Sequence, residues 1–128
     1  MDKNQIKILV VDDEQDIKPL FEQRFRREIR QGEISFTFAF SGEEALAYMN
    51  EHASEVVLIL SDINMPGMSG IELLKRIRKT HPSPHPMVMI ITAYNDNDYY
   101  QQAISGGADD FLTKPLDFKL LKEKLTTL

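Results

Sequence analysis

Residues 56–70 read VVLILSDINMPGMSG, and this stretch decides the fold. Five apolar residues run directly into Ser61 and Asp62, and Pro66 and Gly70 then mark a loop. A short apolar run bounded by Pro and Gly predicts a buried strand followed by a loop. The Asp at the carboxyl end of this strand either opens a turn or belongs to a functional site, and the rest of the sequence is needed to distinguish the two.

Apolar runs of strand length alternate with segments of helical spacing on both sides of this stretch. Ser41 and Ser69 are each followed three residues later by Glu, the capping-box signature of a helix start. Pro19 is tolerated only in a first helical turn, so the first helix should begin near residue 15 or 16. The expected strands are residues 6–11, 34–40, 56–61, 87–91 and 110–112, and the expected helices are residues 15–29, 42–51, 70–80, 95–105 and 117–128.

Strands that alternate with helices in this way predict an α/β fold. We expect a doubly wound, flavodoxin-like three-layer sandwich whose parallel sheet has the order 2-1-3-4-5. The 128 residues should form one domain, 1–128, with an ordered core from about residue 5 to the end. Leucines at helical spacing in the last helix should face the core: Leu120, Leu121, Leu125 and Leu128.

Composition argues against several classes of function. The formal net charge of −5 disfavours direct binding to nucleic acid. The longest apolar runs have five residues, too short to cross a membrane, and the N-terminus lacks a secretory signal pattern. The absence of Cys removes thiol chemistry and fits the reducing cytoplasm, where we expect the protein to act. Two basic clusters fall on expected helices and are explained most simply as solvated faces: Arg24, Arg26, Arg27 and Arg30, and Lys75, Arg76, Arg78 and Lys79.

The carboxyl ends of the strands carry the residues that point to a site. In a doubly wound sheet, ligands bind beyond these ends, where the strand order reverses. The first strand ends in Asp12 and Asp13, the third in Asp62, the fourth in Thr92, and the fifth leads to Lys114. Carboxylates about 4 Å apart repel by roughly 4 kcal/mol per pair at an effective dielectric of 20, so some are protonated or a cation lies among them. Hard oxygen ligands without Cys or a nearby His select Mg²⁺ or a similar ion, which in turn invites a phosphoryl group.

The reach of the other two side chains is consistent with this site. Neighbouring strands lie about 4.8 Å apart, so a short Thr hydroxyl suffices on the fourth strand and a long Lys is needed on the fifth. Each residue also has a simple structural explanation: Asp12 as a helix cap, Thr92 as a strand former, Lys114 as a surface lysine. For each residue taken alone, the structural explanation is favoured. Turn chemistry does not, however, readily explain why all of these residue types occur together at the ends of four strands.

Four motifs stand at the ends of the expected strands: VVDDE at 10–14, LSDINMPGMSGIELL at 60–74, IITAY at 90–94 and DDFLTKP at 109–115. In this order and spacing they resemble the receiver domain of two-component response regulators, of the single-domain chemotaxis-regulator type. The resemblance spans essentially the whole chain. It implies that Asp62 takes a phosphoryl group from a phosphohistidine on a sensor histidine kinase or histidine phosphotransfer protein. It also implies that the protein is not an enzyme, apart from catalysing its own phosphorylation and dephosphorylation.

The same resemblance implies a role for each site residue. Asp13 and Asp62 would bind Mg²⁺ directly, together with the backbone carbonyl of Asn64. Asp12 would act through a metal-bound water.

The resemblance also implies how the signal would leave the site. Thr92 would bond a phosphoryl oxygen, and Lys114 would form an ion pair with the phosphoryl group. Phe111 occupies the place of an aromatic switch residue, which turns inward when Thr92 moves towards Asp62. A static, buried Phe111 is the alternative.

Further residues are expected to tune or support the site. Asn64 and Tyr94 should modulate the lifetime of the phosphoryl group, with Tyr94 at the rim slowing the attack of water. The Lys114–Pro115 bond is expected to be cis, although only about 5–6% of X–Pro bonds in folded proteins are. Pro66 and Gly70 should have structural roles in the loop after the third strand.

Other functions compete with this interpretation. A phosphatase with an aspartyl nucleophile usually carries a second Asp two residues later, but Asn64 stands there and cannot be a general acid. A flavodoxin-like binding module needs a phosphate loop rich in Gly, Ser or Thr, whereas residues 12–16, DDEQD, repel phosphate. An unphosphorylated scaffold usually lacks part of the site, and this chain has all of it.

Receiver domains commonly bind partners through the fourth helix, fifth strand and fifth helix. Tyr99, Tyr100 and Ile104 fall on the fourth helix and cannot all point inward. We expect at least one exposed aromatic there, serving a homodimer or an effector or output domain. We also expect this chain to be the N-terminal receiver of a longer regulator rather than a stand-alone protein.

Overall fold

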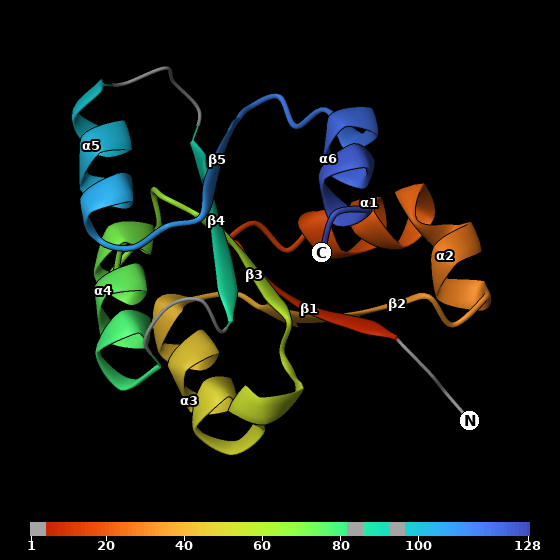
Figure 1. Cartoon of the computed structure of the whole chain (residues 1–128), viewed down its shortest axis with the longest axis horizontal. Helices are drawn as coiled ribbons and strands as arrows, with labels where there is room; N and C mark the ends of the chain where they lie inside the picture. The colour runs from red at the N-terminus through yellow and green to blue at the C-terminus, as the bar shows by residue number, and fades with distance from the viewer. Residues whose placement is uncertain (1–4, 82–85, 93–96) are drawn as a thin grey trace.

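The computed structural model describes residues 5–81, 86–92 and 97–128. Its strands form one parallel sheet in the order β2-β1-β3-β4-β5, which confirms the predicted fold class (Figure 1). The strands are β1 Ile6–Val11, β2 Ile34–Ala39, β3 Leu58–Asp62, β4 Met87–Thr92 and β5 Asp110–Thr113. The helices are α1 Ile17–Arg24, α2 Arg26–Arg30, α3 Gly42–His52, α4 Gly70–Thr80, α5 Asn97–Ser105 and α6 Phe118–Leu125, with a short 3-10 turn at Ala53–Glu55.

Helices cover both faces of the sheet, so the molecule has three layers. Figure 1 shows α3, α4 and α5 on one side and α1, α2 and α6 on the other. Strand residues alternate between two hydrophobic cores: Leu9 and Ile59 belong to one, Ile8 and Leu58 to the other. β3 is buried along its whole length and begins at Leu58, two residues later than predicted. Within the described residues, we find no helix whose length and apolar character would let it span a bilayer.

The first helix differs from the prediction because it is broken into α1 and α2 at Phe25. This residue has φ −110° and ψ 22°, outside the helical region. Its side chain is fully buried, with its ring 5.9 Å from that of Phe21 and 5.0 Å from that of Phe36. The aromatic cluster holds Phe25 in place while the chain changes direction, and helical spacing alone does not reveal such a break.

The prediction that four leucines of the last helix face the core is wrong for two of them. Leu121 and Leu125 are buried, whereas Leu120 is 41% exposed and Leu128 is 36% exposed. Residues four apart share one face of a helix, and a neighbouring residue is turned away by about 100°. Leu120 therefore points out when Leu121 points in, and Leu128 lies beyond the end of α6.

Gly70 allows the start of α4 to approach the end of β3. A Cβ atom at this position would overlap the carbonyl oxygen of Asp62 and the Cα of Ile63. The backbone N–H of Gly70 donates to the carbonyl oxygen of Ile63 at 2.9 Å. Ser69 caps the helix by accepting a hydrogen bond from the backbone N–H of Glu72 at 3.1 Å, as the capping box predicts. The loop after β3 is thus folded tightly against the strand end that carries Asp62.

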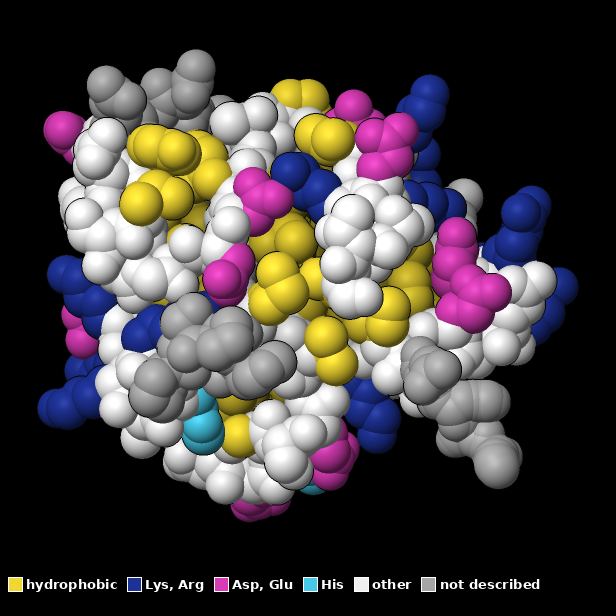
Figure 2. Space-filling view, in the orientation of Figure 1, with side chains coloured by type: hydrophobic (Ala, Val, Ile, Leu, Met, Phe, Trp, Pro, Cys, Tyr) yellow, Lys and Arg dark blue, Asp and Glu magenta, His cyan; other side chains and the backbone are white. Residues whose placement is uncertain are grey.

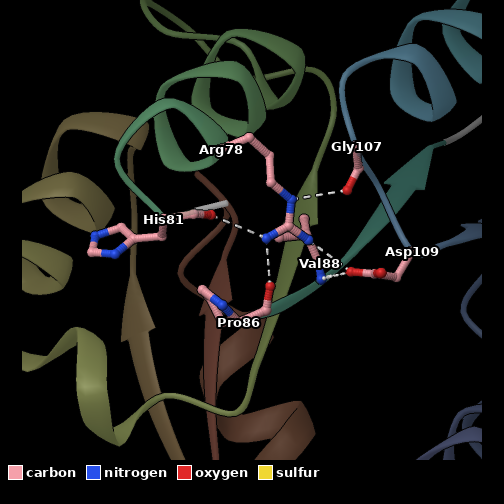
Figure 3. A network of polar contacts seen from close by, with 6 residues as sticks. All are labelled: Arg78, His81, Pro86, Val88, Gly107 and Asp109. Atoms are coloured by element: carbon pink, nitrogen blue, oxygen red, sulfur yellow. Dashed lines mark hydrogen bonds and ion pairs between the residues drawn. The ribbon is translucent and has the colours of Figure 1, made fainter. Parts of the chain in front are cut away.

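Arg78, near the end of α4, joins three segments of the chain (Figure 3). Its Nε donates to the carbonyl oxygen of Gly107 at 2.9 Å, and one terminal nitrogen donates to that of Pro86 at 2.7 Å. The other terminal nitrogen lies 2.7 Å from Oδ2 of Asp109, which also accepts from the backbone N–H of Val88. These contacts, which we call the Arg78 clamp, fasten α4 to the start of β4 and to the turn between α5 and β5.

Candidate functional site

Three polar side chains are buried where β1, β3 and β4 end. Asp12 directly follows β1, Asp62 is the last residue of β3, and Thr92 is the last residue of β4. Their exposed fractions are 4%, 5% and 0%. Parallel pairing of β1 with β3, and of β3 with β4, brings these ends side by side. The structure therefore gathers at one edge of the sheet residues that are far apart in the sequence.

Lys114 reaches the carboxylates from the end of β5. Its Nζ lies 3.3 Å from Oδ2 of Asp62 and 3.8 Å from Oδ2 of Asp12. Its backbone N–H donates to the carbonyl oxygen of Thr92 at 2.7 Å, which fastens the chain after β5 to the end of β4. The Lys114–Pro115 bond is cis, the isomer that the resemblance implies.

Burial dominates the electrostatics of the two inner carboxyls. It raises the pKa of Asp62 above its ordinary value, against the opposing attraction of Lys114. Burial also raises the pKa of Asp12, helped by repulsion from Asp62 and opposed by a backbone hydrogen bond from Glu14. Partial burial by itself lowers the pKa of Lys114, but Asp62 and Asp12 together outweigh it, so this pKa is raised. The site thus carries more buried negative charge than one ammonium group neutralises.

The acidic cluster has the donor set of a hard cation site. Asp13, which is exposed, joins Asp12 and Asp62, and one carboxylate oxygen from each lies within 4.8 Å of the others. These donors are oxygens only, and they are negatively charged, which suits Mg²⁺ better than a thiolate- or imidazole-binding metal. The residues present therefore fit the predicted ion.

Asp12 is held in place by a contact that the sequence reasoning missed. Its Oδ1 accepts a hydrogen bond from the backbone N–H of Glu14 at 2.9 Å. Asp side chains commonly accept a hydrogen bond from the backbone N–H two residues later in the chain, so the local sequence could have indicated this contact. The suggested helix-cap role for Asp12 is wrong, because α1 begins at Ile17 with Asp16 in the N-cap position.

Phe111 and Tyr100 lie together on the α5–β5 face. Phe111 is half-buried in β5, and its ring packs edge-on against that of Tyr100 with the centroids 5.1 Å apart. Tyr100 is 41% exposed, and Ile104 on the same helix is 44% exposed. The expected exposed aromatic on this helix is therefore present, whereas the side chain of Tyr99 lies outside the described residues.

Two other predicted residues lie in the loop after β3. Asn64 and Pro66 are exposed, and the buried side chain of Met65 between them fixes the loop to the protein. Tyr94, predicted at the rim of the site, lies outside the described residues.

Comparison with known proteins agrees with the fold. The family model of the response regulator receiver domain matches residues 8–126. The transcriptional regulatory protein ZraR of Salmonella typhimurium is 34% identical over 125 residues, which are 98% of this chain and 26% of that protein. The cyclic di-GMP phosphodiesterase of Thermotoga maritima is 39% identical over 88 residues, 69% of this chain and 22% of that protein. The chain thus spans about a quarter of the length of these curated relatives.

Solved structures are similar as well. The receiver domain of the Francisella response regulator 1452 has a TM-score of 0.82 and 31% identity, covering 96% of this chain and 95% of that one. A co-crystal structure from Saccharomyces cerevisiae contains the histidine phosphotransfer signaling protein Ypd1 and the receiver domain of its downstream response regulator Ssk1. Its matching chain has a TM-score of 0.82 and 28% identity, and the match covers 98% of this chain and 90% of that one.

Proposed function

This chain belongs to the response regulator receiver domain family, and on that premise we propose that Asp62 accepts a phosphoryl group from a histidine kinase or histidine phosphotransfer protein. The observation that carries the proposal is the position of Asp62. Its carboxylate is buried at the end of β3, beside two other acids and 3.3 Å from the ammonium of Lys114.

Transfer would proceed by attack of an Asp62 carboxylate oxygen on the phosphorus of the donor phosphohistidine. An oxygen–phosphorus bond forms, the nitrogen–phosphorus bond breaks, and the donor imidazole keeps the electron pair and takes up a proton. The product is an acyl phosphate, which water can hydrolyse, so the signal is transient. Lys114, whose Nζ lies 3.3 Å from Oδ2 of Asp62, would form an ion pair with the phosphoryl oxygens. Positioning and the neutralisation of charge provide most of the catalysis in phosphoryl transfer.

We propose that the acidic cluster binds Mg²⁺. Asp13, Asp62 and the backbone carbonyl of Asn64 would hold the ion, with Asp12 acting through a water. When bound, Mg²⁺ supplies positive charge that offsets the carboxylates and the transferred phosphoryl group. Asp12 would keep its orientation through the hydrogen bond from Glu14.

We infer that Thr92 and Phe111 carry the signal away from Asp62. A phosphoryl group offers the Thr92 hydroxyl a charge-assisted hydrogen bond, worth about 1.5–3 kcal/mol. Moving a two-state equilibrium from about 1:99 to 99:1 takes roughly 5.5 kcal/mol, so this contact and those of Lys114 together are of the right size. Phe111 is half-buried against Tyr100, an intermediate position from which its ring can turn further inward.

The α5–β5–α6 face is our candidate for the partner surface. Tyr100 and Ile104 are exposed on it, and they would contact a second copy, an effector or an output domain. The upstream partner would be a sensor kinase or phosphotransfer protein in the cytoplasm, and Tyr94 and Asn64 would set the phosphoryl lifetime.

Acetyl phosphate and Mg²⁺ test the central proposal. Intact-mass measurement should find one added phosphoryl group on the protein and none on Asp62→Asn. Asp117→Asn is a matched control, because Asn is as good a helix cap as Asp at the start of α6. Undiminished labelling of Asp62→Asn would refute the assignment.

A further inference from the structure

A basic surface lies where α1, α2 and α6 meet. Its members, which we call the arginine rim, are Arg24, Arg26, Arg27 and Arg30, and all four are exposed. Among the ion pairs within the described part of the chain, none joins an arginine of the rim to a carboxylate. Figure 2 shows Lys and Arg side chains projecting at the right, where Figure 1 places α1 and α2. In a chain whose net charge is −5, this local excess of positive charge invites an anionic partner.

An apolar pocket adjoins the arginine rim. It has a volume of about 200 Å³, and its walls include Ile6, Phe25, Ile34 and Leu125. The neighbouring groove, of about 430 Å³, is lined by the arginine rim and shares Glu28 and Lys122 with the pocket. The two hollows are therefore adjacent. They lie at the amino ends of β1 and β2, opposite the edge of the sheet that carries Asp62.

Glu28 lies between the pocket and the groove, where it pairs with Lys122. One of its carboxylate oxygens lies 3.2 Å from Nζ of Lys122, and the other, Oε1, is closed off from solvent and has no hydrogen-bond partner among the described residues. The pocket therefore offers an occupant mainly apolar walls.

The size and chemistry of the two hollows specify an occupant. Small-molecule sites usually measure about 300–1,000 Å³, so the smaller pocket suits a single side chain better. Tyr and Trp combine an apolar ring, which suits the pocket, with one donor group that can stay at the polar part of its lining, which includes Glu28 and Glu33. Carboxylates next to that ring would reach the arginine rim, where bidentate pairing with guanidinium is strong. We propose that this surface binds an acidic protein segment through one aromatic anchor.

Nucleic acid and membrane surfaces fit these features less well. A duplex has phosphates for the arginine rim but no side chain for the apolar pocket, and the acidic remainder of the chain repels it. A bilayer is entered by apolar groups that protrude, whereas here the apolar surface is concave. A protein segment can fill the apolar pocket with a side chain and pair its carboxylates with the arginine rim at the same time.

The test is selection of a random peptide library displayed on phage against the full chain. We expect the selected peptides to carry Asp or Glu around a Tyr or Trp. Their affinity should fall at least about tenfold for the double variant Arg27→Glu/Arg30→Glu, which reverses rim charges, and for Thr126→Phe, which fills the pocket mouth. Lys75→Glu/Lys79→Glu makes the same change in net charge on exposed residues of α4 and should bind like the wild type.

Phosphorylation of Asp62 by acetyl phosphate serves as the folding check, and all variants should pass it. The proposal is overturned if the selected peptides lack acidic residues or bind the rim variant as well as the wild type. It is also overturned if duplex DNA or phosphatidylglycerol vesicles, and not acidic peptides, bind in a manner that Arg27→Glu/Arg30→Glu abolishes.

Discussion

The ammonium nitrogen of Lys114 lies 3.3 Å from Oδ2 of Asp62, although 52 residues separate the two in the sequence. Asp12 is 3.8 Å from the same nitrogen, so one cation serves two buried carboxylates. From this imbalance of charge we expect the stability of the site to depend on pH and on Mg²⁺.

Asp12→Asn should raise the free energy of unfolding at neutral pH in Mg²⁺-free buffer, by about 1 kcal/mol. The change removes one of two neighbouring buried negative charges. Because burial raises the pKa of Asp12, stability from this carboxyl is present below its unfolded pKa and lost as pH rises through the folded pKa. The difference in the free energy of unfolding between the variant and the wild type should therefore disappear at acid pH. Urea unfolding measures both values, and a less stable variant at neutral pH contradicts this account.

Addition of Mg²⁺ should raise the melting temperature of the wild type, and a chelator should reverse the change. An ion that binds only the folded protein stabilises it by about 2.7 kcal/mol at one hundred times its Kd. Asp13→Asn should abolish most of the shift, because it removes an exposed ligand without changing the buried pair. Asp16→Asn, outside the acidic cluster, is the control and should respond like the wild type. An equal shift in both variants would place the ion elsewhere.

Gly70→Ala should destabilise the protein by about 2–4 kcal/mol and slow its phosphorylation. The added Cβ would overlap backbone atoms of Asp62 and Ile63, so the end of β3 must move. Gly32→Ala is the comparison, because Gly32 has φ +75° but open space around its Cα. That variant should cost only about 1–2 kcal/mol and leave phosphorylation intact. Thermal melts and initial rates with acetyl phosphate separate the two effects.

Arg78→Ala should cost about 2–4 kcal/mol, since it removes the part-buried hydrogen bonds to the carbonyls of Gly107 and Pro86 and the ion pair with Asp109. Arg78→Lys should recover little, because a single ammonium cannot reach carbonyls on two segments and a carboxylate at once. Arg76→Ala, which removes an exposed ion pair with Glu72, should change stability by less than about 1 kcal/mol. Similar losses at both positions would mean that the Arg78 clamp contributes little.

Beryllofluoride, a mimic of the phosphoryl group, should change the environments of Thr92 and Phe111 together. Thr92→Ala should uncouple them, leaving the Phe111 ring signals near those of the free protein while Asp62 is still modified. Thr92→Ser keeps the hydroxyl and should preserve the coupling. NMR of the Phe111 ring measures this, and unchanged ring signals in the activated wild type would exclude the proposed switch.

The layout of the fold and most of the site could be predicted because they depend on local patterns. The apolar run before Asp62 indicates a central strand, and the fold class then places Thr92 and Lys114 at the same edge of the sheet. Strand order needed no contact information, since few arrangements of alternating strands and helices are common.

The features that escaped prediction depend on partners distant in the sequence. The break at Phe25 follows from its packing against other aromatic rings, and the outward position of Leu120 follows from the face that α6 buries. Arg78 was interpreted as part of a solvated face, which is wrong, because its side chain is 9% exposed and bonded to residues up to 31 positions away. The spacing of apolar residues along the sequence predicts which residues share a helix face, but it does not predict which other residues that face contacts.

The position of β1 between β2 and β3 has a consequence for the newly made chain. β1 acquires both neighbours only after β3 has been synthesised, and the site acquires its cation only when Lys114 leaves the ribosome. Parallel strands joined by long crossovers fold late and together, because loop closure precedes any gain from pairing. An incomplete chain therefore has these acids without their lysine until the last strand has joined the sheet.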